Sequence, residues 1–439
     1  MNLNPIAENL NNILKSSNSY ILDMLSETGT ALFFPKGIVT QSAEAKEKAY
    51  RFDATIGMAT EKTKTMYLPS IMELLNALTP EEALTYASSY GIKPLREAWK
   101  KSEYNKNISL AGKKISLPVV TNAITHGLSV TADMWLKPND ILVLPDKLWG
   151  NYNLIFRLYH KVKMETFPLF DNNFKFNISA FEESLIRAGN AQGKVTALLN
   201  FPNNPTGYTP TVKEADELAD AIERVANMGI NIVVIVDDAY FGLIFEDGVL
   251  RESIFAKIHG RHPRILCIKL DGPTKEDYVW GLRVGFITYG ALWNGENQKL
   301  AYDALEQKTG AAVRGTISNA CHLSQEVVLK AMSSNTYSEE KQHKYEIMKS
   351  RLLEVKRILS DPRFNEVWDV YPFNSGYFMC IRLKNGLDGE KFRVHLLEKY
   401  GVGVIASGGS DIRIAFSCLD TDKIKEFFEI MLKAANEFK

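Results

Sequence analysis

Two side chains eight residues apart, Lys275 and Arg283, have the types and spacing for chemistry at a carbonyl group beside an anion. Lys275 stands between two apolar runs, 265–268 and 284–289, which we interpret as buried strands. Burial would lower the pKa of the lysine amine, and a neutral amine is the form that makes an imine. The guanidinium of Arg283 can hold an anion through two hydrogen bonds, and Gly285 would let the backbone come close. A carbonyl and a phosphate together suggest pyridoxal phosphate as the cofactor.

The same stretch resembles a family signature. Class I/II aminotransferases of fold type I carry a lysine, an arginine eight residues later and then x-Gly, as residues 275–285 do. The resemblance implies that Lys275 binds the cofactor and Arg283 its phosphate; Lys269 is the nearest alternative lysine. The family usually has a serine three residues before the lysine. Gly272 stands there, so Thr274 or the backbone is expected to take its place.

A second set of polar residues follows the apolar run 230–236, which has the continuous hydrophobicity of a strand buried on both faces. The carboxyl end of such a strand is where open α/β sheets bind ligands. The residues there resemble the family's Asp-x-Ala-Tyr. This implies that Asp237 pairs with the pyridine nitrogen of the cofactor, making the ring an electron sink, and that Tyr240 hydrogen-bonds the ring oxygen. Asp238 is the alternative carboxylate, and capping of a turn is the alternative role.

A phosphate site is predicted where a helix begins. Residues 119–121 have a short strand pattern, and a helix is expected to follow and to end near Leu136. A helix N-terminus offers free N–H groups and the positive end of its dipole to an anion. We therefore predict that the backbone of Ala123 and Ile124, with the hydroxyl of Thr125, holds the phosphate. Many family members have glycine in place of Ala123, and plain helix capping is the competing account.

Two further residues are assigned to the cofactor ring by resemblance. Trp149 follows the apolar run 141–145, and Trp-Gly-Asn resembles the aspartate aminotransferase branch, where the indole stacks on the pyridine ring. Core filling is the alternative. Asn204 lies in the turn-rich run 200–207, which contains the family's Asn-Pro-Thr-Gly. This implies that Asn204 donates its amide N–H to the phenolate oxygen of the cofactor; a simple turn is the alternative.

Gly57 and Arg413 are the expected contacts of the substrate. Arg413 is alone among apolar neighbours in the strand pattern 411–417, and a buried guanidinium needs a partner. The family's Arg-Ile-Ala-Phe-Ser implies that this partner is the substrate α-carboxylate, with an internal salt bridge as the alternative. Gly57 would let a substrate approach backbone amides closely, or it is an ordinary turn glycine.

Arg314 and Tyr86 are expected to act across a subunit interface. Arg314 stands four residues before Ser318-Asn319, as does the arginine with which aspartate aminotransferases bind a distal carboxylate in the neighbouring subunit. A pairing at the interface itself is the alternative. Tyr86 resembles the family tyrosine that reaches the cofactor phosphate of the neighbouring subunit, and Tyr90 is the residue that could be confused with it. The resemblance thus implies a homodimer with shared active sites.

Composition excludes several other classes of function. Lys plus Arg and Asp plus Glu both number 52 among 439 residues, so no basic field would concentrate nucleic acid or an anionic membrane. Four separated cysteines without Cys-x-x-Cys indicate neither a zinc site nor a disulfide framework, and we expect no metal. No apolar run is long enough to span a bilayer, and the N-terminus lacks a basic head. We therefore expect a cytoplasmic protein whose partners are small molecules.

The expected architecture is α/β. The resemblance implies a fold-type I PLP-transferase with a large cofactor-binding domain over 66–335, in which helices sandwich a mostly parallel sheet. A small α+β domain would be formed from both termini, by residues 1–65 and 336–439.

Late in the chain, the patterns predict helices over 295–308 and 318–332, separated by a non-helical stretch over 310–319 that contains two glycines. A charged segment over 338–361 is predicted to be a long solvated helix that links the two domains.

The expected activity is transfer of an amino group between an L-amino acid, dicarboxylic or aromatic, and a 2-oxo acid. Lys275 would move a proton between the substrate α-carbon and the cofactor as general acid/base. Two alternatives stay open: a lyase or decarboxylase with the same cofactor, and a non-catalytic module that binds the cofactor or an amino acid. No basic helix-turn-helix pattern precedes Gly57, which argues against a DNA-binding regulator.

Overall fold

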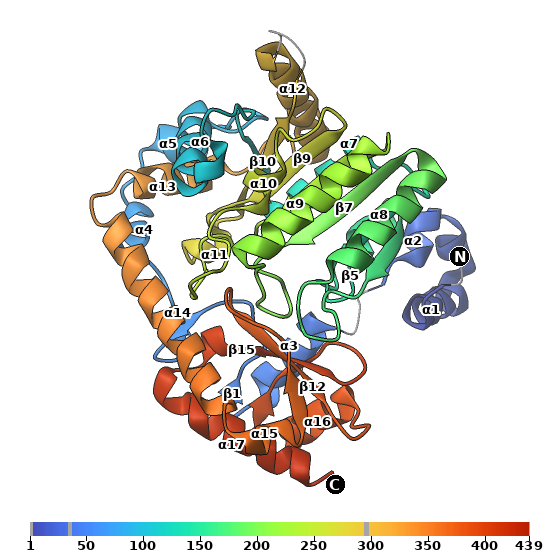
Figure 1. Cartoon of the computed structure of the whole chain (residues 1–439), viewed down its shortest axis with the longest axis vertical. Helices are drawn as coiled ribbons and strands as arrows, with labels where there is room; N and C mark the ends of the chain where they lie inside the picture. Colours follow the sequence, from blue (N-terminus) through green and yellow to red (C-terminus); the bar gives the residue numbers. More distant parts are fainter. Residues whose placement is uncertain (1–2, 34–36, 294–297, 439) are drawn as a thin grey trace.

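A seven-stranded sheet forms the centre of the larger part of the molecule (Figure 1). The structure is a computed structural model that describes residues 3–33, 37–293 and 298–438. The strand order is β4-β10-β9-β8-β7-β5-β6, and all neighbouring pairs are parallel except the two that involve β10. The strands are β4 Val119–Asn122, β5 Ile141–Pro145, β6 Lys163–Phe167, β7 Lys194–Asn200, β8 Asn231–Asp237, β9 Ile265–Asp271 and β10 Val284–Ala291.

Helices cover both faces of this sheet, which explains the unbroken apolar runs of its central strands. Successive residues of β8 enter two different hydrophobic cores. Val234 packs in the core shared with α8 (Ile178–Gln192) and α9 (Val212–Asn227), and Ile235 packs in the core shared with α7 (Ala123–Trp135). The other helices of this part are α4 Pro69–Leu74, α5 Pro80–Leu84, α6 Lys93–Lys106, α10 Ile254–Ile258, α11 Pro273–Glu276, α12 Gln298–Ile317 and α13 His322–Met332. The short hairpin of β2 Thr60–Glu61 and β3 Lys64–Thr65 contacts the smaller part at residues 416–418.

The smaller part, in the lower half of Figure 1, joins the C-terminal residues to a segment from near the N-terminus. Its antiparallel sheet has the order β11-β12-β15-β14, and beside it β1 pairs in parallel with β13. The strands are β1 Phe52–Asp53, β11 Trp368–Val370, β12 Phe378–Leu383, β13 Val402–Gly403, β14 Ile405–Ala406 and β15 Asp411–Ala415. The helices are α3 Ile38–Lys48, α14 Tyr337–Leu359, α15 Pro362–Asn365, α16 Gly389–Tyr400 and α17 Ile424–Asn436.

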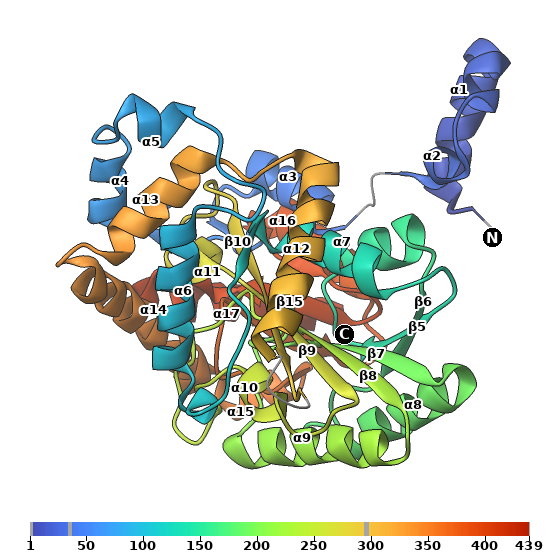
Figure 2. The ribbon, with the colours of Figure 1, turned by 90° about the horizontal axis from the view of Figure 1, so that it is seen from above.

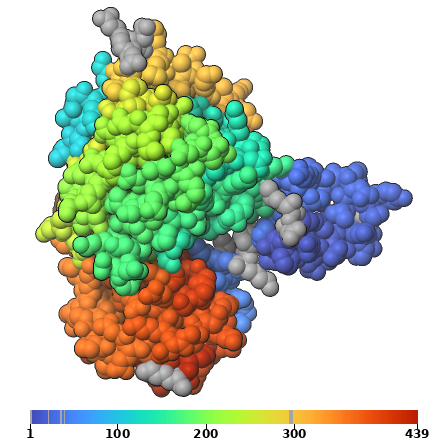
Figure 3. Space-filling model, turned by 45° about the vertical axis from the view of Figure 1, so that its right-hand side comes forward, coloured from blue at the N-terminus to red at the C-terminus, as the bar shows by residue number. Residues whose placement is uncertain are grey.

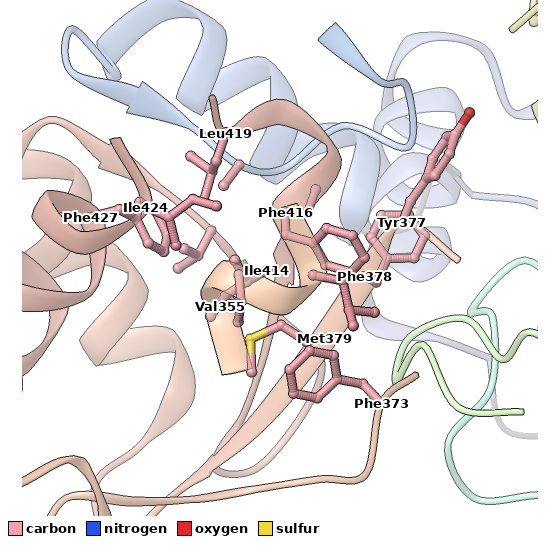
Figure 4. Close-up of a cluster of buried hydrophobic side chains, with 14 of the residues drawn as sticks. Val355, Phe373, Tyr377, Phe378, Met379, Ile414, Phe416, Leu419, Ile424 and Phe427 are labelled. Carbon is pink, nitrogen blue, oxygen red and sulfur yellow. The ribbon is translucent and has the colours of Figure 1, made fainter. Parts of the chain in front are cut away.

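The core of the smaller part holds β12 and β15 against α14 and α17 (Figure 4). Met379 of β12 and Ile414 of β15 are fully buried together with Val355 of α14 and Phe427 of α17. This packing fixes β15, the strand that carries Arg413, on a rigid support.

The two N-terminal helices, α1 (Pro5–Asp23) and α2 (Glu27–Ala31), stand away from the rest of the molecule (Figures 2 and 3). They lie beside the larger part, where α2 contacts η2, the helical segment Asn153–Tyr159. Glu27 pairs there with Lys161 at 2.6 Å.

The predicted non-helical stretch over 310–319 is wrong. α12 continues without a break as far as Ile317, so both of its glycines lie inside a helix. Gly310 is required there by packing, because a Cβ at this position would lie 2.4 Å from the ring of Tyr90. The start expected at residue 295 lies outside the described residues.

The prediction of a solvated helix over 338–361 is also wrong in part. α14 is helical as expected, but one face is buried, and Leu352 on it is fully excluded from solvent. Its charges also have partners: Lys341 lies 2.7 Å from Asp277, and Arg351 lies 2.9 Å from Asp420. The charge pattern alone could not show that these partners lie in other elements.

Within the described ranges, no helix combines the length and the apolar character needed to cross a membrane. The same residues contain no cluster of histidine, cysteine and acidic side chains that could hold a metal ion. All four cysteines are free thiols.

Candidate active site

A cavity of about 290 Å³ lies at the carboxyl ends of β7 and β8, lined by residues of both the larger and the smaller part. This is the edge at which open parallel sheets bind ligands. The predicted site residues that line it are Gly57, Ala123, Ile124, Thr125, Trp149, Asn204, Asp237, Tyr240, Thr274, Lys275, Arg283 and Arg413. Sequence reasoning missed five further lining residues, Ile38, Tyr152, Asn200, Ala239 and Phe378.

Lys275 lies in α11, a single helical turn between β9 and β10 rather than an open loop. Its Nζ donates a hydrogen bond to the carbonyl oxygen of Gly57 at 2.9 Å and lies 5.2 Å from the centre of the Tyr240 ring. Burial, helped by the charges of Arg413 and Arg283, lowers the pKa of Lys275 to about 8. An amine with this pKa is partly neutral near pH 7, so it can act as a nucleophile or a base.

The alternative lysine and the alternative carboxylate lie together outside the cavity. Lys269 is fully buried, with its Nζ 2.5 Å from Asp271, 3.0 Å from Glu103 and 3.4 Å from Asp238. Burial alone would lower the pKa of Lys269, but the three carboxylates raise it above its ordinary value. Neither Lys269 nor Asp238 lines the cavity. Of the two lysines and the two aspartates, Lys275 and Asp237 are the ones that line the cavity.

Asp237 ends β8 and is buried at the floor of the site. Its Oδ2 accepts a hydrogen bond from the hydroxyl of Tyr152 at 2.6 Å, and its Oδ1 accepts one from the N–H of Ala239 at 3.2 Å. Burial raises the pKa of Asp237 to about 6, although these hydrogen bonds favour the ionised form. No ion pair with Asp237 occurs among the described residues, so its negative charge is available to a ligand.

The predicted phosphate cradle is the turn from β4 into α7. Ala123 opens this helix with a φ of +60°, a left-handed conformation that glycine adopts more easily. A Cβ at Gly285 would lie 2.8 Å from the backbone nitrogen of Ile124. Gly285 therefore makes room for the start of the helix, whereas the sequence had suggested close approach to the anion itself. Arg283, which lines the same end of the cavity, has a pKa lowered by burial.

Thr274 lines the cavity one residue before Lys275, and its hydroxyl lies 3.5 Å from the carbonyl oxygen of Val284. Gly272, where the family usually has serine, has no room for a side chain. A Cβ there would lie 2.6 Å from the same carbonyl oxygen. A serine hydroxyl at position 272 would therefore require β10 to move.

Arg413 reaches the cavity from β15 and is 2% exposed. It donates to the side-chain oxygen of Asn204 at 3.2 Å and to the carbonyl oxygen of Thr55 at 2.7 Å, and it lies 4.2 Å from the centre of the Phe378 ring. Its Nε has no partner, and the salt bridge considered as an alternative does not occur among the described residues. A buried guanidinium without a carboxylate fits an anionic ligand.

Trp149 is half-buried at the cavity wall, with its ring edge-on to Tyr152 at 5.5 Å. Tyr86 and Arg314 do not line this cavity. Tyr86 is 91% exposed, and Arg314 lies on the exposed side of α12, where it donates to the hydroxyl of Ser318 at 3.0 Å. Both side chains are thus accessible on the surface of the single chain.

Residues 55–431 match the family described as Aminotransferase class I and II. The chain therefore belongs to the class I and II aminotransferases, and it is an aminotransferase enzyme that carries out transamination. The cytoplasmic aspartate aminotransferase of Saccharomyces cerevisiae is 24% identical over 70% of this chain and 74% of its own length. The LL-diaminopimelate aminotransferase of Halothermothrix orenii is 22% identical over 84% of this chain and 88% of its own length.

Solved structures share the fold. An aminotransferase from Anaerococcus prevotii superposes with a TM-score of 0.81 at 23% identity, covering 95% of this chain and all of that one. A kynurenine aminotransferase from Pyrococcus horikoshii, in complex with PMP, gives a TM-score of 0.77 at 18% identity, covering 96% of this chain and 98% of that one. The fold-type I α/β architecture expected from the sequence is confirmed.

Proposed function

We propose that this enzyme transfers an amino group between an L-amino acid, dicarboxylic or aromatic, and a 2-oxo acid, with pyridoxal 5′-phosphate as its cofactor. One observation carries the proposal: a single cavity contains the amine of Lys275 and two buried charges of opposite sign, those of Asp237 and Arg413, which have no ion-pair partner among the described residues. Relatives named as aspartate and aromatic-amino-acid aminotransferases support both substrate classes.

The residues present fit this cofactor at each of its parts. The unpaired carboxylate of Asp237 matches a protonated pyridine nitrogen, because a buried charge is stable only when compensated. Trp149 offers an aromatic face to the ring, and Asn204 and Tyr240 offer hydrogen-bond donors to its oxygen. The cofactor would supply an aldehyde and an electron-withdrawing ring. The residues that would hold its phosphate are Ala123, Ile124, Thr125, Thr274 and Arg283.

The chain's own residues divide the remaining tasks. Arg413 binds the α-carboxylate of the substrate and so directs the α-carbon toward Lys275. Lys275 would take the proton from that carbon and deliver it to the cofactor, since a pKa of about 8 lets the amine hold or release a proton near neutral pH. The carbonyl oxygen of Gly57 orients the amine, and the hydroxyl of Tyr152 orients Asp237.

A lyase or decarboxylase is the second reaction class to test. The purified enzyme, supplied with pyridoxal phosphate and 2-oxoglutarate, should convert aspartate or an aromatic amino acid to the corresponding oxo acid. It should form glutamate from 2-oxoglutarate when the donor is another amino acid. Release of ammonia, thiol or CO₂ without transfer of the amino group would contradict the proposal. A protein that only binds the amino acid would neither transfer the amino group nor release these products.

The identity of the reactive lysine has a separate test. Borohydride reduction of the loaded enzyme, followed by peptide mapping, should place the pyridoxyl label on Lys275. Lys269 is the control, since its three carboxylates keep it protonated and it lies outside the cavity. A label on any other lysine would contradict the assignment.

We propose further that the enzyme is a cytoplasmic homodimer of two-domain subunits, divided near residues 65 and 335. The pairing of β1 with β13 supports the joining of both termini in the small domain, while the helices over 5–31 form an arm against the larger part. The exposure of Tyr86 and Arg314 supports their action in a neighbouring subunit's cavity. Four free cysteines support a reducing compartment.

A further inference from the structure

Two charged residues outside the cavity, Lys147 and Asp411, connect the larger part to the smaller part. The Nζ of Lys147 lies 2.6 Å from Oδ2 of Asp411. Lys147 stands two residues before Trp149, and Asp411 stands two residues before Arg413. Neither lines the cavity, so each is placed to act through its neighbour in the chain.

The strand β15 links Asp411 to Arg413. Side chains alternate along a strand, so these two residues project from the same face of β15, toward the larger part. Arg413 contacts Asn204 at 3.2 Å, and the amide of the adjacent Asn203 donates to the carbonyl oxygen of Lys147 at 3.0 Å. β15 therefore contacts two loops of the larger part, and a hydrogen bond joins these two loops to each other.

Tyr371 contacts both side chains of this ion pair. The Tyr371 hydroxyl donates to Oδ1 of Asp411 at 3.0 Å, and the Nζ of Lys147 lies 4.9 Å from the centre of the Tyr371 ring. Phe170 of the larger part stacks on the same ring at 5.8 Å. Burial alone would lower the pKa of Lys147, but the hydrogen bond to Asp411 and the charge of Asp146 raise it. The lysine is thus held in its charged form.

The side chains of Lys147 and Asp411 are only 19% and 12% exposed. Solvent screening therefore weakens this pair less than it weakens an ion pair on the open surface. Both oxygens of Asp411 are engaged, one by Lys147 and one by Tyr371. Replacing either Lys147 or Asp411 leaves buried groups unpaired and frees the start of β15.

We propose that Lys147, Tyr371 and Asp411 are positioning residues that fix Arg413 relative to the ring site at Trp149 and Asn204. The inference rests on the proposed role of Arg413 in binding the substrate carboxylate. Loosening β15 therefore weakens binding of the carboxylate, while the groups that move the proton are unchanged.

The test uses the loaded full-length enzyme and propionate as a probe of the carboxylate site. Isothermal titration gives the Kd of propionate for the wild type, Lys147→Met, Asp411→Asn, the double variant and Lys147→Arg. The matched control is Lys194→Met. It breaks a pair with Asp140 of the same 2.6 Å length and similar burial, at the opposite edge of the sheet. Circular dichroism at the assay temperature shows that each variant is folded.

Lys147→Met and Asp411→Asn are expected to raise the Kd of propionate, and the KM of the amino acid, about tenfold, because each removes a charge-assisted hydrogen bond. Their kcat should change by less than about threefold, since Lys275 and Asp237 are untouched. The double variant should bind no more weakly than the worse single variant, because one interaction is lost in each. Lys147→Arg should recover most of the affinity, and Lys194→Met should leave the Kd unchanged even if its Tm falls.

An unchanged Kd in Lys147→Met and Asp411→Asn, or an equal loss in Lys194→Met, overturns the inference while leaving the proposed function intact. Additive losses in the double variant overturn it as well. If the wild type neither transaminates nor binds propionate, the proposed function fails and this inference fails with it.

Discussion

Two lysines six residues apart show how surroundings decide the chemistry of one residue type. Lys269 is enclosed by Glu103, Asp238 and Asp271, which hold its charge in place. Besides Asp237, the charged groups that act on Lys275 are two arginines. Burial lowers the pKa of Lys275 to about 8. The first lysine is structural, and the second is free to exchange a proton near neutral pH.

This difference predicts opposite effects on stability. Below pH 8, Lys275 is protonated in both the folded and the unfolded chain, so burying its charge destabilises the fold. Above its ordinary pKa of 10.5 the amine is neutral in both, and the penalty disappears. In the protein without cofactor, Lys275→Met should therefore be more stable than the wild type near pH 7, by roughly 1–3 kcal/mol. The difference should shrink between pH 8 and 10.5.

Thermal unfolding followed by circular dichroism over this pH range measures the difference in Tm. Lys269→Met is the control of opposite sign, since it leaves three carboxylates buried without their cation and should lower the Tm. A Tm difference between Lys275→Met and the wild type that does not depend on pH would contradict the assigned pKa.

The neighbouring aspartates predict a separation of activity from stability. Asp237→Asn should fold normally but lose activity about a hundredfold or more, because the neutral amide cannot compensate a protonated ring nitrogen. Asp238→Asn should retain most of its kcat, because Asp238 does not line the cavity. It should lower the Tm, since Asp238 faces Lys269 and accepts from the hydroxyl of Ser253 at 2.5 Å. Similar losses of activity in the two variants, or a larger loss in the second, would show that the wrong aspartate has been assigned to the ring nitrogen.

At the residue scale, the sequence predicted the side chains of the site that stand at a recognisable spacing in the chain. It missed the side chains that only the fold brings close to the cavity. Asp237 stands three residues before Tyr240 at the end of an apolar run, and both line the cavity. Tyr152, which hydrogen-bonds Asp237, comes from a segment 85 residues earlier and belongs to no spacing pattern. Ile38 reaches the cavity from α3, far from any motif.

At the scale of elements, α11 is held by contacts outside the cavity lining. Glu276, which follows Lys275, lies 2.7 Å from Lys106 of α6 and 3.0 Å from Lys341 of α14. Tyr377 of the smaller part donates to the carbonyl oxygen of Lys275 at 2.7 Å. Two helices and Tyr377 thus fix this single turn and aim the Lys275 side chain into the cavity.

The same tight packing predicts that restoring the family's serine before α11 would harm the protein. Gly272→Ser should lower the Tm and weaken binding of pyridoxal phosphate, because its Cβ would lie 2.6 Å from the carbonyl oxygen of Val284. Gly281→Ser is the matched control, since a Cβ there has nothing within 4 Å. Fluorescence titration with the cofactor and thermal unfolding measure both effects. Tighter cofactor binding in Gly272→Ser would contradict the packing argument.

Element boundaries were predictable where the hydrophobic pattern decides them. β8 ends at Asp237, directly after the apolar run over 230–236 that the sequence indicated. α12 was mispredicted because Gly310 reads locally as a helix breaker, while its real role is to admit the ring of Tyr90. A tertiary contact of this kind leaves no local signal.

At the scale of the whole molecule, two arginines line the cavity of one chain among the described residues, Arg283 and Arg413. The first is proposed to bind the cofactor phosphate, and the second the α-carboxylate of the substrate. A dicarboxylic substrate has a second carboxylate that needs its own cation. The proposed source is Arg314 from the neighbouring subunit of the homodimer. Selectivity for acidic substrates would then be a property of the dimer, whereas an aromatic substrate would not require Arg314.

Arg314→Ala tests this selectivity. It should lower kcat/KM for aspartate and glutamate by about tenfold to a hundredfold, the usual loss for one charge-assisted pair, and change it little for phenylalanine. Equal losses for all three substrates would show that Arg314 does not bind the distal carboxylate.

Mixed dimers decide which subunit supplies the arginine. Co-expressed Lys275→Ala and Arg314→Ala chains form hybrids in which one of the two shared cavities combines an intact Lys275 with an intact Arg314 from the other chain. With random pairing of equal amounts, activity toward aspartate should reach about a quarter of the wild-type value, although Lys275→Ala alone is inactive and Arg314→Ala alone is weak. If Arg314 served the cavity of its own chain, no hybrid cavity would be complete, and the mixture would show no more activity than the Arg314→Ala chains provide.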